Sequence, residues 1–366
     1  MAHHQRVRTH RHRRRGRSVL RHGVAVRHPG HGSPRMITAD EVGRFPGKLP
    51  RELGGTETSL VEQYDLIEAL AHRDGSLGWN HTFMGSSAGI VAARLPDDGV
   101  AEVREPDGRW PRFCGTFPMT GIATPAPGGF RLDGRWGFAS GIRAASWVAC
   151  GATRSDDATP VWLVVPVTEV TVHDTWDSPG LARTQSCEYT IHDRFVPTSR
   201  TFAISGAPLR GGPLFSMPIQ AYLTPDHTGV TIGCARRALE ECARHSAGKQ
   251  RLGSAQALDA RGAFVRDLGR AHTQLASAIA HVRDVLARMD HADLVDPSLF
   301  LDARCAATNA AEIAVSVATF AYRNGGAHAV TATSEIGRAY RDAMTSSQHV
   351  HVLDDVYEWR GAELLR

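Results

Sequence analysis

Six cysteines are scattered through this 366-residue chain, and no two of them make a Cys-x-x-Cys pair. The sequence therefore contains no disulfide framework, and the thiols are expected to be reduced, as in a cytoplasmic protein. Long apolar runs are missing as well, since no stretch approaches the roughly eighteen uncharged residues of a membrane-spanning helix. We expect a cytoplasmic protein with no membrane partner.

Acidic residues are missing from the first 35 positions, which hold ten arginines and seven histidines. The formal net charge of +4 is therefore misleading, because the rest of the chain carries −6. A basic tail can bind nucleic acid, but this one has no aromatic residue and no DNA-binding pattern. It also lacks the apolar segment of a secretory signal. We expect residues 1–35 to be a disordered extension, with Met36 as the natural start, and we expect no nucleic-acid partner.

The chain also lacks the alternation of strand and helix that builds a parallel sheet. Helical spacing of apolar residues dominates 36–110, short alternating strands occupy 111–205, and long amphipathic helices fill 206–366. This order predicts an α+β protein with an N-terminal helical domain, a middle β-domain and a C-terminal helical bundle.

Turn residues and apolar spacing predict where the main helices begin and end. We expect a helix over 60–72 that ends at Asp74-Gly75, a second over 78–95, and a break at 96–99. In the last third, apolar residues three and four positions apart predict long helices from about 257 to 286 and over 303–322.

The stretch 128–150, GGFRLDGRWGFASGIRAASWVAC, has the most informative local pattern. Asp133-Gly134 is typical of a two-residue hairpin turn between alternating strands. After such a turn, one face of the sheet would carry Trp136, Phe138 and Ser140. Gly141 follows, where a backbone can approach a ligand closely. From these residues alone, a hairpin whose serine merely ends a strand is the plainer interpretation.

This stretch resembles the flavin-dependent monooxygenases of the acyl-CoA dehydrogenase fold, which are the oxygenase components of two-component aromatic hydroxylases. Other segments match the same family in the same order, and together they cover about residues 45–362. They are Pro50 to Gly55, Gly78-Trp79, Asp174-Thr175-Trp176 with Gly180-Leu181, Val196-Pro197, Gly248 to Arg251, and Arg338 to His349. The shared order, rather than any single segment, makes the resemblance specific.

The resemblance implies the acyl-CoA dehydrogenase fold, with a four-helix bundle as the C-terminal domain. It implies hydroxylation of an aromatic or polycyclic small molecule by O2 through a C4a-hydroperoxyflavin. Reduced FMN or FAD would diffuse from a separate NAD(P)H-flavin reductase, since no nicotinamide-binding GxGxxG follows a strand here. A homotetramer is the family expectation.

The resemblance also carries roles for individual residues. In the family a serine of the hairpin motif hydrogen-bonds the flavin near N5, and Ser140 stands at that position. A histidine after an Arg-Asp pair lies over the flavin, and here His349 follows Arg341-Asp342. Imidazole suits this role because it titrates near neutrality and can hydrogen-bond a peroxide. The implied catalytic residues are Ser140 and His349, and the implied flavin neighbours of Ser140 are Trp136, Phe138 and Gly141.

Further candidates come from the same comparison, each beside a plainer structural interpretation. Lys249 and Arg251 suit the flavin phosphate, although they also suit a solvated helix end. Gly325-Gly326 resembles the turn that approaches the cofactor of a neighbouring subunit, and it also suits a helix C-cap. The substrate pocket is expected to be lined by Trp79, Asn80 and His81.

Two details set limits on these expectations. His349 and His351 form a His-x-His pair, but positions two apart on a helix point away from each other, and no further ligand cluster accompanies them. We therefore predict no metal. The loop 180–186 reads GLARTQS where the family often has GLRGTGS, so Gln185 replaces a glycine and leaves the flavin contacts of this loop open.

Two alternative functions stay open. An acyl-CoA dehydrogenase or related desaturase would need a carboxylate over the flavin ring, and neither Glu335 nor Glu358 fits the usual place of that base. A non-redox member of the fold would keep the scaffold for binding alone.

Overall fold

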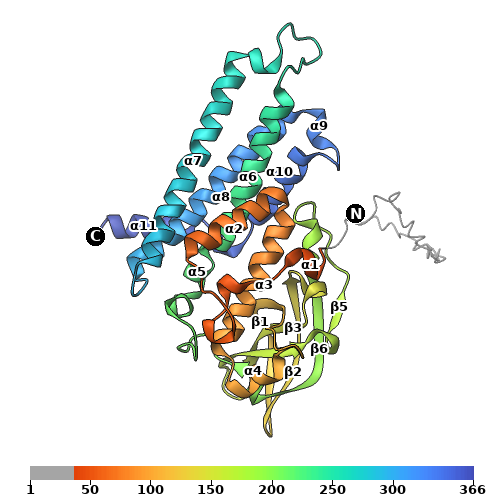
Figure 1. Ribbon diagram of the computed structural model, residues 1–366, viewed down its shortest axis with the longest axis vertical. Helices are drawn as coiled ribbons and strands as arrows, with labels where there is room; N and C mark the ends of the chain where they lie inside the picture. Colours follow the sequence, from red (N-terminus) through yellow and green to blue (C-terminus); the bar gives the residue numbers. More distant parts are fainter. Residues whose placement is uncertain (1–36) are drawn as a thin grey trace, which may run out of the picture. The chain divides into compact units, whose positions relative to one another are not determined.

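Helices begin and end the part of the chain that the structure, a computed structural model, describes, and a sheet lies between them (Figure 1). That part is residues 37–366, so the expectations for residues 1–35 concern positions outside the described residues. The order of helices, sheet and helices agrees with the α+β architecture expected from the spacing of apolar residues.

The N-terminal helices are α1 (Ala39–Val42), α2 (Leu60–Arg73), α3 (Gly75–Arg94) and α4 (Asp97–Val103). Asp74 separates α2 from α3, because its carboxylate accepts the backbone N–H groups of Ser76 and Leu77 and so begins the next helix. The break expected at 96–99 is shorter than predicted. Pro96 does end the preceding segment, but α4 starts directly after it with two acidic residues in its first turn.

Within residues 37–366, seven strands form one sheet in the order β5-β6-β2-β1-β3-β4-β7. In this described sheet β1 and β3 run parallel, and the other neighbours are antiparallel. The strand bounds are β1 (Phe113–Ala126), β2 (Gly129–Ala139), β3 (Trp147–Arg154), β4 (Pro160–Pro166), β5 (Thr171–His173), β6 (Cys187–Pro197) and β7 (Thr201–Phe202).

The hairpin turn lies at Pro127-Gly128, not at Asp133-Gly134 as predicted. Ala126 pairs with Gly129 across the turn, and Gly128 has a φ of +82°, which proline followed by glycine favours. Asp133-Gly134 lies inside β2, which pairs with β6 on its other side. Two turn signals stand six residues apart in the sequence, and strand pairing with β6 selects the first.

A bulge in β2 then separates the three residues that were expected to share one face. Trp136 pairs with Tyr189 and Ala139 with Cys187, so β2 has one residue more than β6 over this step. Phe138 adopts a φ of +57° there and is 78% exposed, whereas Trp136 is 1% exposed. The prediction of a common face for Trp136, Phe138 and Ser140 is therefore wrong.

The C-terminal part is a helical bundle of α6 (Thr224–Ser246), α7 (Gly262–Asp290), α8 (Pro297–Gly325) and α10 (Glu335–Ser346), with α5 (Ile219–Tyr222), α9 (Ala327–Val330) and α11 (Asp355–Leu364) as short additions. The two long helices predicted from apolar spacing are present as α7 and α8. Most of the predicted stripe on α7 is buried, at Ala271, Leu275, Val282 and Leu286, whereas Ile279 is half-buried.

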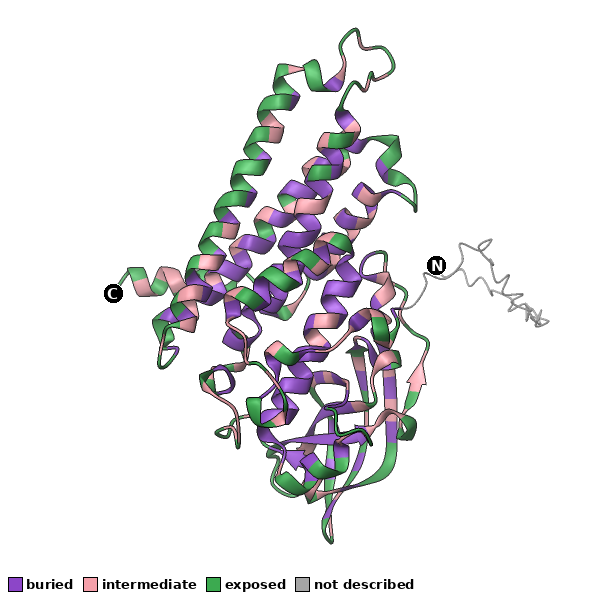
Figure 2. Cartoon of the chain, viewed as in Figure 1, coloured by how far each residue is buried: buried purple, intermediate pink, exposed green. Residues whose placement is uncertain are grey.

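Helix α3 packs against both the sheet and the bundle, through β1 and α6 (Figure 1). It is buried along most of its length, as the purple ribbon in Figure 2 shows. Its small residues make this possible: a Cβ on Gly89 would meet the backbone oxygen of Lys48 at 2.1 Å, and one on Gly115 of β1 would meet Ser87 of α3 at 2.2 Å. Side chains on α3 therefore reach both parts of the protein.

Candidate functional site

The hydroxyl of Ser140 lies at the end of β2, where it meets the indole of Trp79 from α3. Trp79 donates its Nε1–H to Ser140 Oγ over 3.0 Å. Ser140 is half-buried, and Trp79 is 9% exposed. Helix α3 thus holds the serine hydroxyl, although 61 positions separate the two residues.

His349 contacts the same indole. It directly precedes a short 3-10 turn, Val350–Val352, that follows α10. Its ring centroid lies 5.7 Å from that of Trp79 at 77° and 5.5 Å from that of Phe83. The two residues assigned to catalysis by resemblance, Ser140 and His349, therefore both contact one aromatic side chain.

The tautomer of His349 follows from its hydrogen bond. Its Nδ1 accepts the backbone N–H of His351 over 3.2 Å, so in the neutral ring the proton is on Nε2. Burial lowers the pKa of His349 to about 4. At neutral pH the residue is an uncharged imidazole whose Nε2–H is available as a donor.

Two further histidines pack behind His349. The His227 ring lies 5.6 Å from it, and His227 Nε2 donates to the backbone oxygen of Ser346 over 2.7 Å. Burial, followed by the neighbouring His349, lowers the pKa of His227 to about 3, and burial also lowers the pKa of His351. Within residues 37–366 no group of three or more His, Cys, Asp or Glu side chains is arranged to hold a metal ion.

The loop 181–186 ties the site together, although its sequence departs from the family pattern. The backbone oxygen of Thr184 accepts both the N–H of Gly141 over 3.0 Å and Nδ2 of Asn80 over 3.4 Å. Asp342 of α10 accepts the N–H of Leu181 over 2.6 Å. Gln185 has φ and ψ of 50°, the left-handed conformation in which glycine is usual, so the substitution keeps the backbone shape at a cost of roughly 1 kcal/mol.

Trp136, Phe138 and Gly141, the expected flavin neighbours of Ser140, lie in three different surroundings. The indole of Trp136 stacks on Tyr189 at 5.2 Å and donates to the backbone oxygen of Gly151 over 2.9 Å, inside the core of the sheet. The close approach at Gly141 is to α3, since a Cβ there would meet Met84 Sδ at 2.3 Å. Phe138 points outward beside Trp176.

Of the three pocket residues expected on α3, only Trp79 meets Ser140 and His349. Successive residues of a helix point about 100° apart, so one face cannot hold all three. Asn80 is buried against the loop through Thr184. His81 turns the other way, where its Nδ1–H donates to the backbone oxygen of Val42 over 2.8 Å. The structure therefore does not bring His81 to Ser140 and His349.

Lys249 meets Gly325 and Arg251 meets the preceding Asn324, at a place distant from Ser140. Lys249 Nζ donates to the backbone oxygen of Gly325 over 3.1 Å, and Arg251 donates to that of Asn324 over 3.2 Å. Their connection between α6 and α7 lies at the end of the bundle away from the sheet (Figure 1). A hollow of about 610 Å³ beside them includes Arg251 and Arg323 in its lining. The chain thus has two separate clusters of candidate residues.

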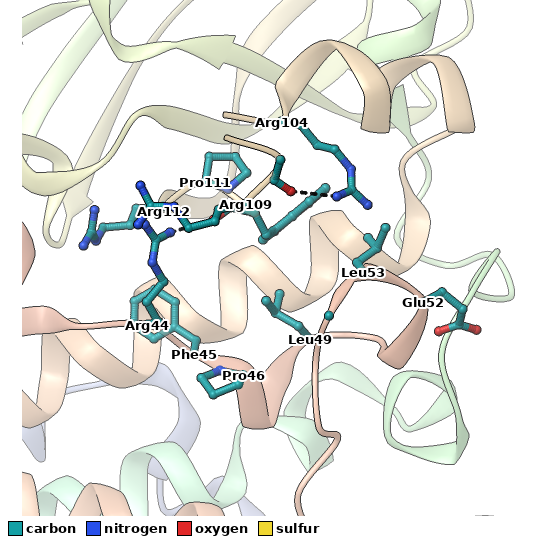
Figure 3. A pocket seen from close by; sticks show the side chains of 13 residues that line it. Arg44, Phe45, Pro46, Leu49, Glu52, Leu53, Arg104, Arg109, Pro111 and Arg112 are labelled. Atoms are coloured by element: carbon teal, nitrogen blue, oxygen red, sulfur yellow. Dashed lines mark hydrogen bonds between the residues drawn. The ribbon is translucent and has the colours of Figure 1, made fainter. Parts of the chain in front are cut away.

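A second hollow, of about 390 Å³, lies between the segment before α2 and the start of β1 (Figure 3). Apolar side chains such as Leu49 line it, and four arginines surround it: Arg44, Arg104, Arg109 and Arg112. Glu105 pairs with Arg44 at 3.5 Å and with Arg109 at 3.7 Å. None of the residues around Ser140 and His349 lines this hollow.

Four residues that the sequence pattern did not single out are brought to Ser140 and His349 in the structure. These are Phe83, Thr184, Ser186 and His227. The unusual loop 180–186 was a signal for Thr184 and Ser186. His227, near the start of a buried helix, had no local signal.

Among residues 37–366, no helix is both long enough and apolar enough to cross a membrane.

Comparison with known proteins places this arrangement among relatives. Residues 227–353 match the family model of the acyl-CoA dehydrogenase C-terminal domain. The chain is 31% identical over 329 residues to an indole-3-acetate monooxygenase of Pseudomonas putida, covering 87% of this chain and 83% of that one. It is 29% identical to the oxygenase component of an FADH2-dependent resorcinol hydroxylase of Rhizobium sp. (strain MTP-10005), covering 58% and 55%.

Solved structures share the fold. XiaF from Streptomyces sp., in complex with FADH2 and glycerol, superposes with a TM-score of 0.80 and 22% identity, covering 89% of this chain and 85% of that one. The predicted arrangement of helical part, sheet and bundle is confirmed by this likeness, which extends well beyond the matched C-terminal segment.

Proposed function

The chain belongs to the flavin-dependent monooxygenases that share the acyl-CoA dehydrogenase fold, and from this membership we propose that it hydroxylates a small aromatic molecule at the site of Ser140 and His349. Reduced flavin would come from a separate reductase, as the name of the resorcinol hydroxylase component implies for that relative. The single observation that carries this assignment of the site is the shared contact of Ser140 and His349 with Trp79.

The residues present fit the reactive edge of a flavin ring. They offer a half-buried hydroxyl, an uncharged imidazole with a free Nε2–H, and the aromatic surfaces of Trp79 and Phe83. Flat aromatic side chains suit a flat ring, and one acceptor with one donor suits its polar edge. Asn80 Oδ1 is also buried and lacks a partner within the described residues.

When bound, reduced flavin supplies the activation of O2, which no side chain can perform. The chain's own part is position, dryness and one proton donor. Ser140 would bind the flavin on the side of N5, and Trp79 with Phe83 would keep water out. His349 would offer Nε2–H as a hydrogen-bond donor to the reactants, and its lowered pKa keeps the ring uncharged.

We further propose that the cluster around Arg251 serves the flavin of another copy of the chain. Lys249 and Arg251 are cationic and bond to the backbone oxygens of Gly325 and Asn324, just before Gly326, but they are far from Ser140 of the same chain. A phosphate bound there would need a second subunit to bring the flavin ring to its own Ser140. The proposed assembly is a homotetramer.

Anaerobic titration with reduced FMN and reduced FAD, followed by O2 and a panel of aromatic acids and phenols, tests the function. Hydroxylated product containing one atom from ¹⁸O2 is the expected result. Failure to bind either reduced flavin would overturn the proposal. Tight binding of oxidised flavin with reduction by an acyl-CoA would favour the dehydrogenase alternative instead.

A further inference from the structure

The hydroxyl of Ser140 belongs to a chain of hydrogen bonds that runs in one direction. The far end is fixed, because Thr184 Oγ1 lies 2.8 Å from the backbone oxygen of Leu181, which can only accept. Thr184 has a single hydroxyl proton, and this contact uses it. Ser186 Oγ, 2.7 Å from Thr184 Oγ1, therefore donates to Thr184.

The position of the Ser140 proton is fixed in the same way. Since the proton of Ser186 points to Thr184, Ser140 donates to Ser186 Oγ across 2.8 Å. At the near end, Trp79 Nε1–H is a donor only, and it points to Ser140 Oγ. A serine oxygen has two acceptor positions, so Ser140 keeps one free acceptor position and no free proton.

Burial holds this direction in place. Thr184 is 1% exposed and Ser186 is 5% exposed, so water has little access to their hydroxyl groups. The reverse direction would leave Thr184 Oγ1 and the backbone oxygen of Leu181 facing each other without a proton, 2.8 Å apart. Two buried acceptors in that position are unfavourable.

We propose that this hydrogen-bond chain makes Ser140 an obligate acceptor and so makes the site selective for reduced over oxidised flavin. The inference rests on the proposed function, in which Ser140 lies at N5 of the ring. N5 of reduced flavin carries a proton and donates, which matches the free acceptor position. N5 of oxidised flavin carries a lone pair and needs a donor, which Ser140 does not offer.

Trp79, Thr184 and Ser186 are therefore positioning residues for the redox state of the cofactor. They do not touch the reacting atoms, but they decide whether Ser140 donates or accepts. An oxygenase that receives reduced flavin from another protein must bind that form and release the oxidised form after each turnover. A one-way hydrogen-bond chain provides this discrimination without any conformational change.

The test compares dissociation constants for reduced and oxidised flavin, measured anaerobically and aerobically by fluorescence. The wild-type protein should prefer reduced flavin by about tenfold or more, the effect of one mismatched buried hydrogen bond. Thr184→Val removes the hydroxyl but keeps the shape, so Ser186 and then Ser140 can reverse. The preference should fall to within about threefold, mostly through tighter binding of oxidised flavin.

Matched variants separate this effect from packing. Thr184→Ser keeps the hydroxyl and should keep the preference, and Ser178→Ala removes a hydroxyl that bonds only to Gly180 in the same loop. A fall from about tenfold to about threefold preference also lowers the two-electron midpoint potential of bound flavin by about 15 mV, because a tenfold change corresponds to about 30 mV. A packing defect would weaken both redox forms equally and leave the potential unchanged.

Three outcomes decide the matter. Equal affinity of the wild-type protein for both redox forms would overturn the inference while the proposed function stands. An unchanged potential in Thr184→Val with bound flavin would also overturn it. Absence of flavin binding in both forms would remove the proposed function itself, and the inference with it.

Discussion

Trp79 donates its indole N–H to the hydroxyl of Ser140 over 3.0 Å while its ring lies 5.7 Å from that of His349. This side chain comes from the buried helix α3, Ser140 from the end of a strand, and His349 from the turn after α10. All three parts of the fold therefore meet at one indole. The site depends on how these parts pack, and less on any of the three segments alone.

Removing the imidazole of His349 should uncouple O2 consumption from hydroxylation. In His349→Ala the Nε2–H donor is lost, so we expect at least about tenfold less product per flavin oxidised and a matching rise in H2O2. Product assay with a peroxide electrode measures both. His351→Ala, which removes the buried ring behind it, is the matched control. Unchanged coupling in His349→Ala would remove this residue from the mechanism.

The pH dependence of that role follows from the pKa of His349, about 4 against an ordinary 6.5. The ring stays neutral from about pH 8 down to about pH 5, so coupling should be flat over this range. Below about pH 4 the ring is protonated, and Nδ1 no longer accepts from His351. Because the folded pKa is depressed, protonation also opposes folding as the pH falls below 6.5.

Much of this architecture could be predicted from the sequence, because α2, α7 and α8 each carry an apolar stripe with clear ends. The position of the hairpin turn could not. Pro127-Gly128 and Asp133-Gly134 are both good turns, and only pairing of β2 with β6 along its length decides between them. The bulge at Phe138 depends on the same pairing, since it needs a count of residues on both strands.

At the site, resemblance identified Ser140 and His349, and the structure brings both to Trp79. The resemblance could not give the direction of the hydrogen bonds from Ser140 to Thr184, because that direction depends on Thr184 Oγ1 lying beside a carbonyl oxygen in a folded loop. The place of His81 apart from Trp79 follows from helix geometry, because a helix turns about 100° per residue and three consecutive residues cannot share one surface.

Asp342 should make folding stability depend on pH in the mildly acidic range. Burial raises the pKa of this carboxyl to about 6, above its ordinary 3.8. The folded state therefore holds a proton that the unfolded state releases, so this contribution is full below about pH 4 and is lost as the pH rises through about 6. Its size is up to about 3 kcal/mol.

Asp342→Asn tests this directly, because the amide oxygen can still accept the N–H of Leu181. We expect the difference in unfolding free energy between about pH 4 and pH 7 to shrink by up to about 3 kcal/mol in the variant. Urea denaturation at several pH values measures it. A wild-type pH dependence in Asp342→Asn would contradict the assignment.

The buried pair of Lys48 and Asp226 should be costly to break from one side. Lys48 Nζ lies 2.7 Å from Asp226 Oδ1, and the two residues are 5% and 0% exposed. The other carboxylate oxygen accepts from Ser86 Oγ, and the Lys48 ammonium lies 4.3 Å from the Tyr222 ring centroid. Burial lowers the pKa of Lys48, while Asp226 opposes that shift.

Lys48→Met leaves an unpaired buried carboxylate, so we expect a loss of about 3–5 kcal/mol in unfolding free energy. Replacing both partners, Lys48→Met with Asp226→Leu, should recover most of it, because no buried charge is then left alone. Denaturant unfolding of the two variants provides the comparison. A double variant as unstable as the single one would show that packing, not charge, dominates here.

The proposed exchange of flavin-binding residues between subunits predicts complementation. Ser140→Ala and Arg251→Ala should each abolish most activity alone, the first at the ring and the second at the phosphate. In an assembly containing both variant chains, one site combines the two defects and another combines the two intact residues. Co-expression with two different tags, followed by tandem purification, isolates such mixed assemblies.

We expect up to about half of the wild-type activity per intact pair of chains, whereas residues that serve their own subunit's flavin would give no recovery. Mixed assemblies of two differently tagged Ser140→Ala chains supply the baseline, because neither arrangement restores a serine.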